Sequence, residues 1–151
     1  MHISAKVEYA VRALLVLAAH GGGPMSGVAL SQEQDLPAKF LDGILAELRR
    51  NHIIVSQRGA DGGYRLARDA ATITLADIIR AIDGPLAAVR GEHPEETSYS
   101  GAASSLKDVW IAVRATLRSV LETTTLADVV SGKLPANVRK LVGDPDAWVS
   151  R

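Results

Sequence analysis

Residues 36–50 read LPAKFLDGILAELRR, and the fold that we expect rests on this stretch. Its apolar side chains recur at the spacing of one helix face; they are Leu41, Ile44, Leu45 and Leu48. This spacing predicts a helix from Ala38 to about Asn51. Pro37 suits the first position of that helix, because its fixed backbone angle is already close to helical.

A tight turn and a shorter helix are expected directly before this stretch. Asp35 tolerates the left-handed backbone that such a turn often requires. Ser26 is a candidate N-cap for a helix that extends to about Gln34. A longer first helix is predicted behind a second N-cap, Ser4, and ends at the glycines 21–23. Two short helices joined by a tight turn are the outline of a helix-turn-helix.

A β-hairpin is expected after the third helix. Residues 53–55 form a β-branched apolar run, and residues 58–63 read RGADGG, which is typical of a turn. Residues 64–66 return as the second strand. Thr74 then caps another helix, which has Leu75, Ile78, Ile79 and Ile82 on its buried face and stops at residues 84–85. We therefore predict a mainly α fold with a small β-hairpin, which is a winged helix-turn-helix.

The composition changes near Val89. Residues 90–105 are rich in Ser, Glu, Gly and Ala, which predicts a mobile, locally acidic loop. A heptad-like seam follows, made of Leu106, Trp110, Val113, Leu117 and Val120. A helix over residues 104–122 would be about 29 Å long, too long for the preceding module to cover. We therefore expect a long dimerisation helix that pairs with a second copy through this seam.

These features divide the chain into four expected parts. Residues 1–88 form the winged helix-turn-helix domain, and residues 89–104 form the mobile loop. Residues 105–131 contain the dimerisation helix and a short helix capped by Thr125, and residues 132–151 form a tail with little order.

Composition excludes several classes of chemistry. The 151 residues contain no cysteine, so disulfides, thiolate metal sites and cysteine nucleophiles are impossible. Net charge is zero, although residues 1–68 carry eight Lys or Arg against six Asp or Glu. The longest apolar run, residues 13–19, is too short to span a bilayer, and no signal peptide is recognisable, so we expect a cytoplasmic protein without membrane contact. No common catalytic motif occurs, so an enzyme is not expected.

Taken together, the motifs resemble those of the Rrf2 family of bacterial winged-helix repressors. Residues 36–49 resemble its recognition helix, and residues 58–66 resemble its wing. Further matches lie at 4–14, 73–86, 109–110 and 124–129, so the resemblance covers roughly residues 1–131. It implies a homodimeric transcription factor that binds an inverted-repeat operator in double-stranded DNA. The family includes regulators of iron–sulfur cluster assembly, the nitric oxide response and cysteine metabolism.

The resemblance also implies which residues contact DNA. The recognition helix contributes Lys39, Phe40 and Asp42; the wing contributes Arg58, Gly62 and Gly63; the start of the first helix contributes Ser4 and Lys6. The flank around Gly43 is our own further candidate for the major groove. Arg49 and Arg50 are additional phosphate candidates. Two alternatives stay open: Phe40 edges the core instead, or Gly43 is only a tolerated exposed residue at a cost of about 1 kcal/mol relative to Ala. Asn51 is expected to take the left-handed position after the helix.

The sequence departs from the family in one segment. Many sensory members carry three cysteines before the long helix, whereas residues 98–105 here read SYSGAASS. A cysteine-ligated iron–sulfur cluster is therefore excluded, and we expect neither a cofactor nor a metal site. An unknown small-molecule effector could act at residues 90–105 or in a pocket near Trp110, or abundance alone could control repression. The alternative from another class is a winged helix that contacts only proteins.

Overall fold

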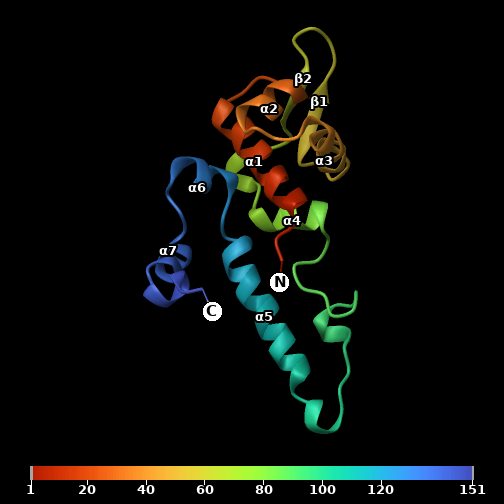
Figure 1. Cartoon of the computed structure of the whole chain (residues 1–151), viewed down its shortest axis with the longest axis vertical. Helices are drawn as coiled ribbons and strands as arrows, with labels where there is room; N and C mark the ends of the chain where they lie inside the picture. The colour runs from red at the N-terminus through yellow and green to blue at the C-terminus, as the bar shows by residue number, and fades with distance from the viewer. Residues whose placement is uncertain (1, 151) are drawn as a thin grey trace.

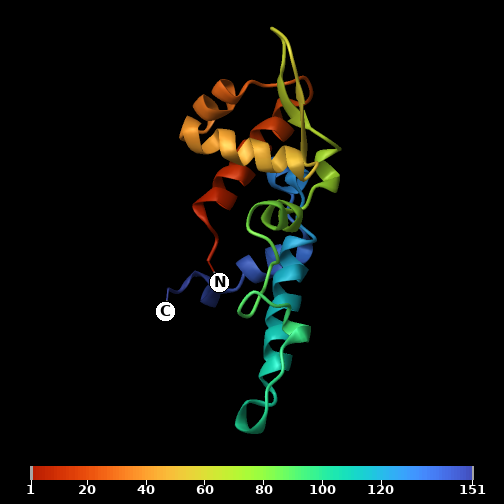
Figure 2. The same cartoon turned by 90° about the vertical axis from the view of Figure 1, so that its right-hand side faces the viewer.

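The computed structural model describes residues 2–150, which form a winged-helix domain at one end and a long helix, α5, that projects from it (Figures 1 and 2). The helices are α1 (Ala5–His20), α2 (Gly27–Glu33), α3 (Ala38–Arg50), α4 (Leu75–Ile82), α5 (Leu106–Leu121), α6 (Leu126–Ser131) and α7 (Ala136–Val142). The two strands are β1 (Ile54–Gln57) and β2 (Gly63–Leu66). The predicted fold class, mainly α with one hairpin, is confirmed.

The helix starts follow the predicted caps. The hydroxyls of Ser4 and Ser26 accept the backbone N–H groups of Val7 and Ala29, each at 3.1 Å. Thr74 and Thr125 form reciprocal capping boxes with the carboxylates three residues later. Bonds from the backbone and the hydroxyl of Thr125 hold the pKa of Asp128 below its usual range.

The turn between α2 and α3 matches its prediction at Asp35, which adopts a left-handed backbone with φ of 51°. Pro37 differs from its prediction, because it is the N-cap of α3 rather than its first helical residue. Asn51 is also different. Its backbone and side-chain amides both donate to the carbonyl of Glu47, which keeps φ at −90°, and the left-handed position passes to His52.

The core of the winged-helix domain is built around α3. All four apolar residues predicted for its inner face are at most 1% exposed. They pack with α1, α4 and β1 in one cluster that includes Leu14 and Ile54. The inner face of α4 was predicted less well: Ala76 and Ile78 are buried, whereas Leu75, Ile79 and Ile82 are only partly covered.

The hairpin is antiparallel, with Ile54 opposite Leu66 and Gln57 opposite Gly63. Backbone bonds join it to the start of α2: the N–H of Tyr64 donates to the carbonyl of Met25 at 2.7 Å, and the reverse bond is 2.9 Å. A Cβ at Gly63 would lie 2.3 Å from that Met25 oxygen. This close backbone approach needs glycine and fixes the base of the wing.

Residues 89–104, predicted as a mobile loop, instead contain two 3-10 turns, Pro94–Glu96 and Gly101–Ala103, and run beside α5 (Figure 1). Pro94 and Thr97 are buried. The indole N–H of Trp110 donates to the hydroxyl of Tyr99 at 3.2 Å. These contacts give the segment a defined path that its polar composition did not indicate.

The end of the chain is also more regular than predicted. Helix α7 and a 3-10 turn, Pro145–Trp148, lie within the expected tail. The side-chain amide of Asn137 donates to the carbonyl of Ser119 on α5, at 2.5 Å, which fastens the start of α7. The sequence signal for a loop came from prolines and glycines that here flank the short helices.

We expect Gly63→Ala to destabilise the fold by more than about 1–3 kcal/mol, because the new Cβ collides with the Met25 backbone and φ is 145°. Gly43→Ala is the matched control. Its Cβ would meet nothing within 4 Å, so removing a helix-interior glycine should stabilise the fold by up to about 1 kcal/mol. Urea unfolding measures both variants, and equal stability of the two would contradict this assignment.

Candidate nucleic-acid interface

The outward face of α3 carries the residues predicted to read DNA. Lys39, Phe40, Asp42 and Gly43 are all exposed, as is Arg49 near the end of the helix. Phe40 keeps 66% of its surface exposed. The alternative in which Phe40 edges the core is therefore wrong. A helix with one fully buried face and an aromatic residue on the other presents a continuous outer surface.

The wing projects beyond the helices as the most distant feature of the domain (Figures 1 and 2). Arg58 is exposed directly after β1, next to the turn in which the N–H of Gly62 donates to the carbonyl of Gly59. A Cβ at Gly62 would lie 2.3 Å from the carbonyl oxygen of Gln57. Gly62 and Gly63 therefore have structural roles that are sufficient to explain their presence, and the tip carries one basic group, Arg58, and one acidic group, Asp61.

The basic residues near the start of α1 are less free than the sequence indicated. The ammonium of Lys6 donates to Glu47 Oε1 of α3 at 2.7 Å, and Arg50 lies 3.6 Å from the same oxygen. The other oxygen of Glu47 is buried and, among the described residues, has no hydrogen-bond partner. Within residues 2–150, Lys39, Arg49 and Arg58 form no ion pair, so their charges remain available to a ligand.

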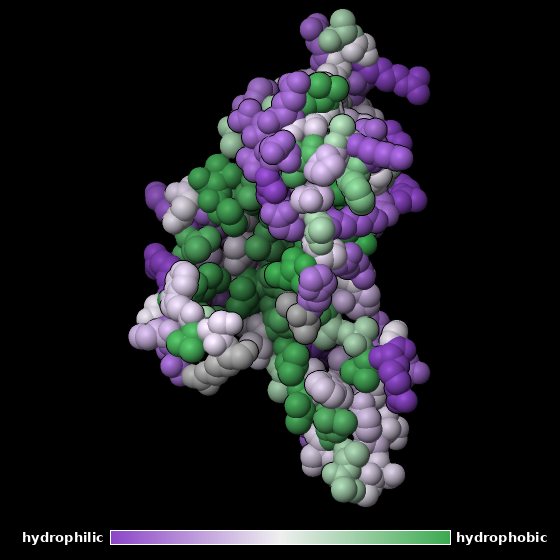
Figure 3. Space-filling model, in the orientation of Figure 1, coloured by the Kyte–Doolittle hydropathy of each residue, from purple (hydrophilic) through white to green (hydrophobic). Residues whose placement is uncertain are grey.

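No side of helix α5 is completely covered by the rest of the chain. None of its residues is buried, and Val109 and Val113 are 49% and 42% exposed. Hydrophobic side chains follow α5 and the space between it and the α6–α7 region, whereas hydrophilic ones crowd the winged-helix end (Figure 3). Leu106 and Val120 of the predicted seam are partly exposed as well.

The other seam residues have neighbours in the same chain. Trp110, Val113 and Leu117 line a hollow of about 290 Å³ together with Pro94 and residues 86–89. The pocket expected near Trp110 therefore exists in outline, and its occupation by an effector stays a prediction. Part of the seam consequently faces residues 86–94 before any partner is considered.

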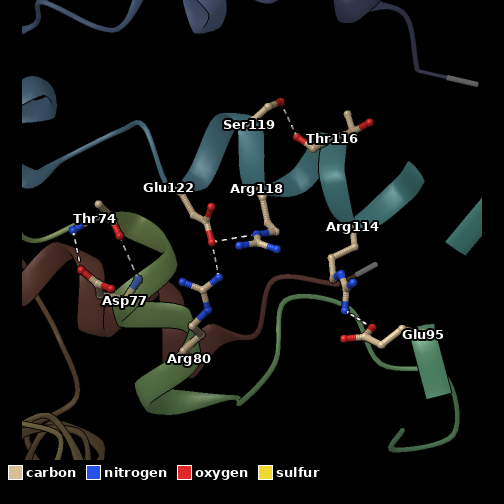
Figure 4. A network of polar contacts seen from close by, with 9 residues as sticks. All are labelled: Thr74, Asp77, Arg80, Glu95, Arg114, Thr116, Arg118, Ser119 and Glu122. Atoms are coloured by element: carbon tan, nitrogen blue, oxygen red, sulfur yellow. Dashed lines mark hydrogen bonds and ion pairs between the residues drawn. The ribbon is translucent and has the colours of Figure 1, made fainter. Parts of the chain in front are cut away.

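A row of charged residues on α5 was missed from the sequence. Arg80 of α4 and Arg118 both donate to Glu122 Oε1, and Arg114 pairs with Glu95 (Figure 4). These bonds hold the pKa of Glu122 below its usual range. The pKa of Glu95 is also lowered, first by a backbone hydrogen bond and then by Arg114. The recurrence of Arg114, Arg118 and Glu122 every four residues is the signal that could have revealed this row.

The chain lacks the thiolate ligands of a cysteine-bound iron–sulfur cluster. The chain has no cysteine, and the family's cysteine-bearing segment presents serines and alanines instead. Across residues 2–150, no group of three His, Cys, Asp or Glu side chains is arranged to hold a metal ion. No helix in the same range has both the length and the apolar character needed to cross a membrane.

Comparisons with known proteins agree with this geometry. Residues 3–132 match the Rrf2 family model, which is described as an iron-dependent transcriptional regulator. Rv1287 of Mycobacterium tuberculosis, provisionally named an HTH-type transcriptional regulator, is 48% identical over 95% of this chain and 90% of its own length. CymR of Bacillus subtilis is 35% identical over 87% of this chain and 91% of its own.

Two solved structures extend the likeness to three dimensions. CymR, the global cysteine regulator of B. subtilis, superposes with a TM-score of 0.75 at 32% identity, covering 88% of this chain and 98% of CymR. IscR of T. potens gives a TM-score of 0.70 at 31% identity, covering 100% and 93%. The chain therefore belongs to the Rrf2 family of DNA-binding, winged-helix transcriptional regulators.

Proposed function

We propose that this protein is a homodimeric repressor that binds an inverted-repeat operator and carries no cysteine-ligated iron–sulfur cluster. The observation that carries the proposal is the outer face of α3, whose inner face is fixed in the core. Phe40 is exposed there, as are Lys39 and Arg49, which form no ion pair within residues 2–150. A major groove is wide enough to admit one such helix.

Each residue of this surface has a distinct role in the proposal. Lys39 and Phe40 contact base edges, and Asp42 accepts a hydrogen bond from a cytosine amino group. Arg49 binds phosphate, and Arg58 reaches the minor groove or a flanking phosphate from the wing. Gly43 has open space on its outer side and no side chain, so it allows the helix backbone to approach a base pair closely.

The Ser4 hydroxyl is already the cap of α1, so this end of the helix offers its remaining N–H groups to a phosphate.

A second copy covers the exposed face of α5. Val109 and Val113 are large apolar side chains left in solvent by the single chain, and burying such a face drives association. A two-fold dimer places two recognition helices on half-sites about one helical turn, or a multiple of it, apart. This arrangement explains why an inverted repeat is the operator that we expect.

Signalling through a cysteine-ligated cluster is not part of the proposal. The chain offers no thiolate, and the segment at the family's cluster position reads SYSGAASS. The small-molecule pocket near Trp110 and control by abundance alone remain alternatives for how repression is relieved. The DNA-binding measurement below distinguishes the repressor from the alternative of a winged helix that contacts only proteins.

The first test measures binding to the protein's own promoter region at several salt concentrations. We expect saturable binding that random DNA of equal length does not reproduce. Phe40→Ala and Asp42→Ala should each cost about 1–3 kcal/mol on the operator and relax specificity. Arg58→Ala should weaken binding and flatten the salt dependence. Arg139→Ala, on exposed α7, is the control, and binding without sequence preference would contradict the repressor proposal.

The second test uses the Lys6–Glu47 ion pair. Glu47→Gln removes the charge that Lys6 and Arg50 share, so both cations become available to phosphates. We expect tighter binding to any duplex and a slope of log K against log salt that steepens by about one for each added contact. Glu33→Gln, at the exposed end of α2, is the matched control. An unchanged slope would place Lys6 outside the interface.

The third test addresses the dimer. Val113→Glu puts a charge into the proposed interface at a side chain that is 42% exposed in the single chain, so folding should be retained. We expect monomers in sedimentation equilibrium and a large loss of operator affinity. Ala115→Glu, which lies near the opposite side of α5, should remain dimeric. A dimer that persists in the Val113 variant would refute this interface.

A further inference from the structure

Three arginines from two helices converge on one hollow. It has a volume of about 460 Å³ and lies between α4, α5 and residues 84–95. Its charged lining consists of Arg80, Arg114, Arg118, His93 and Glu95. Gly84, Pro85, Leu86 and Ala87 complete the wall. Arg80 from α4 and Arg118 from α5 approach each other at Glu122, whereas Arg114 extends from α5 towards Glu95 (Figure 4).

The carboxylates present do not saturate these arginines. A guanidinium has five N–H donors, so three of them offer far more donors than two carboxylates can accept. Glu122 uses one oxygen, Oε1, for both Arg80 and Arg118, with the Arg118 bond at 2.9 Å. Among the residues that the structure describes, Arg114 has one ion-pair partner, Glu95. Three guanidinium groups thus face two carboxylates, Glu95 and Glu122, so the hollow has an excess of positive charge.

Arg114 is the decisive residue. Its side chain is only 20% exposed, whereas that of its partner Glu95 is 53% exposed. A cation that is largely removed from water is stabilised by a well-placed anion, and an exposed carboxylate on a short turn is a partner that a ligand can replace. The volume is within the range typical of small-molecule sites.

We infer that this hollow binds a small anion bearing carboxylate or phosphate groups. The anion replaces Glu95 on Arg114 and takes further hydrogen bonds from Arg118 and Arg80. Planar, multi-donor guanidiniums are the side chains best suited to such oxyanions. The bound anion contacts both α4 and α5. Because Glu95 holds the Pro94–Glu96 turn against α5, the anion also releases that hold. This inference does not depend on the proposed function, since it concerns binding without DNA.

The test follows Trp110 fluorescence in the full chain. Trp110 lies one helical turn from Arg114, and Trp148→Phe removes the second tryptophan, which is 75% exposed on the last turn. Sodium phosphate and sodium citrate are titrated separately at constant ionic strength. We expect saturable binding of at least one of them. Tighter phosphate binding assigns a phosphate ligand, and tighter citrate binding assigns a carboxylate ligand.

Variants separate the site from a general salt effect. Arg114→Met and Arg118→Met should each weaken binding about tenfold or more. Arg139→Met on α7 should leave it unchanged. Glu95→Gln should tighten binding because the competing charge is lost, and a gain of affinity cannot arise from misfolding. The inference is overturned if neither anion saturates by fluorescence or calorimetry, or if Arg114→Met binds as tightly as the parent.

Discussion

The burial of one face of α3 is the constraint on which the rest of the molecule depends. Leu41, Ile44, Leu45 and Leu48 are almost completely removed from water, and each contributes roughly 1.5–3 kcal/mol to the core. Because side chains on a helix have fixed angular positions, anchoring these residues also determines which others face outward. Phe40 is thus exposed because the opposite face of α3 is packed in the core. The same packing turns the proposed DNA-binding surface outward.

Helix α5 differs from α3 in how much of its surface the single chain buries. Helix α5 has no buried residue of its own, so the single chain supplies only part of its cover. Residues 86–97 cover one side through Pro94, and the Arg114–Glu95 pair stands at the edge of that contact. The remaining apolar side is the region that the proposed dimer would cover. The proposed dimer and residues 89–104 would therefore cover different parts of the surface of the same helix.

The sequence predicted the elements whose signals are local. Caps at Ser4, Ser26 and Thr74 and the α3 stripe are readable because hydroxyl position and apolar spacing act within one helical turn. The departures depend on which polar partner a group finds, whether it lies within one helical turn or far along the chain. His52 takes the left-handed backbone because Asn51 is bonded back to Glu47, and Lys6 loses its freedom to a partner 41 residues away. Residues 89–104 gain structure from contacts with α5 together with hydrogen bonds inside their own turns, such as the one from the Thr97 hydroxyl to the carbonyl of Pro94. The exposure of Lys39, Asp42 and Arg49 was readable from periodicity, whereas the exposure of Phe40 and the pairing of Lys6 were not.

The bonds between residues 73–75 and 124–126 have a mechanical consequence. The N–H of Leu75 donates to Thr124, and the N–H of Leu126 donates to Ile73, at 2.9 and 3.0 Å. They attach the carboxyl end of α5 to the winged-helix domain. The helix, about 24 Å long, projects from this point with its other end away from the domain. A small tilt at this attachment is multiplied along that length into a displacement of ångströms at the free end. Residues 89–104, which lie between α4 and this free end, contact α5 through the Pro94–Glu96 turn, so a tilt of α5 would also displace this segment.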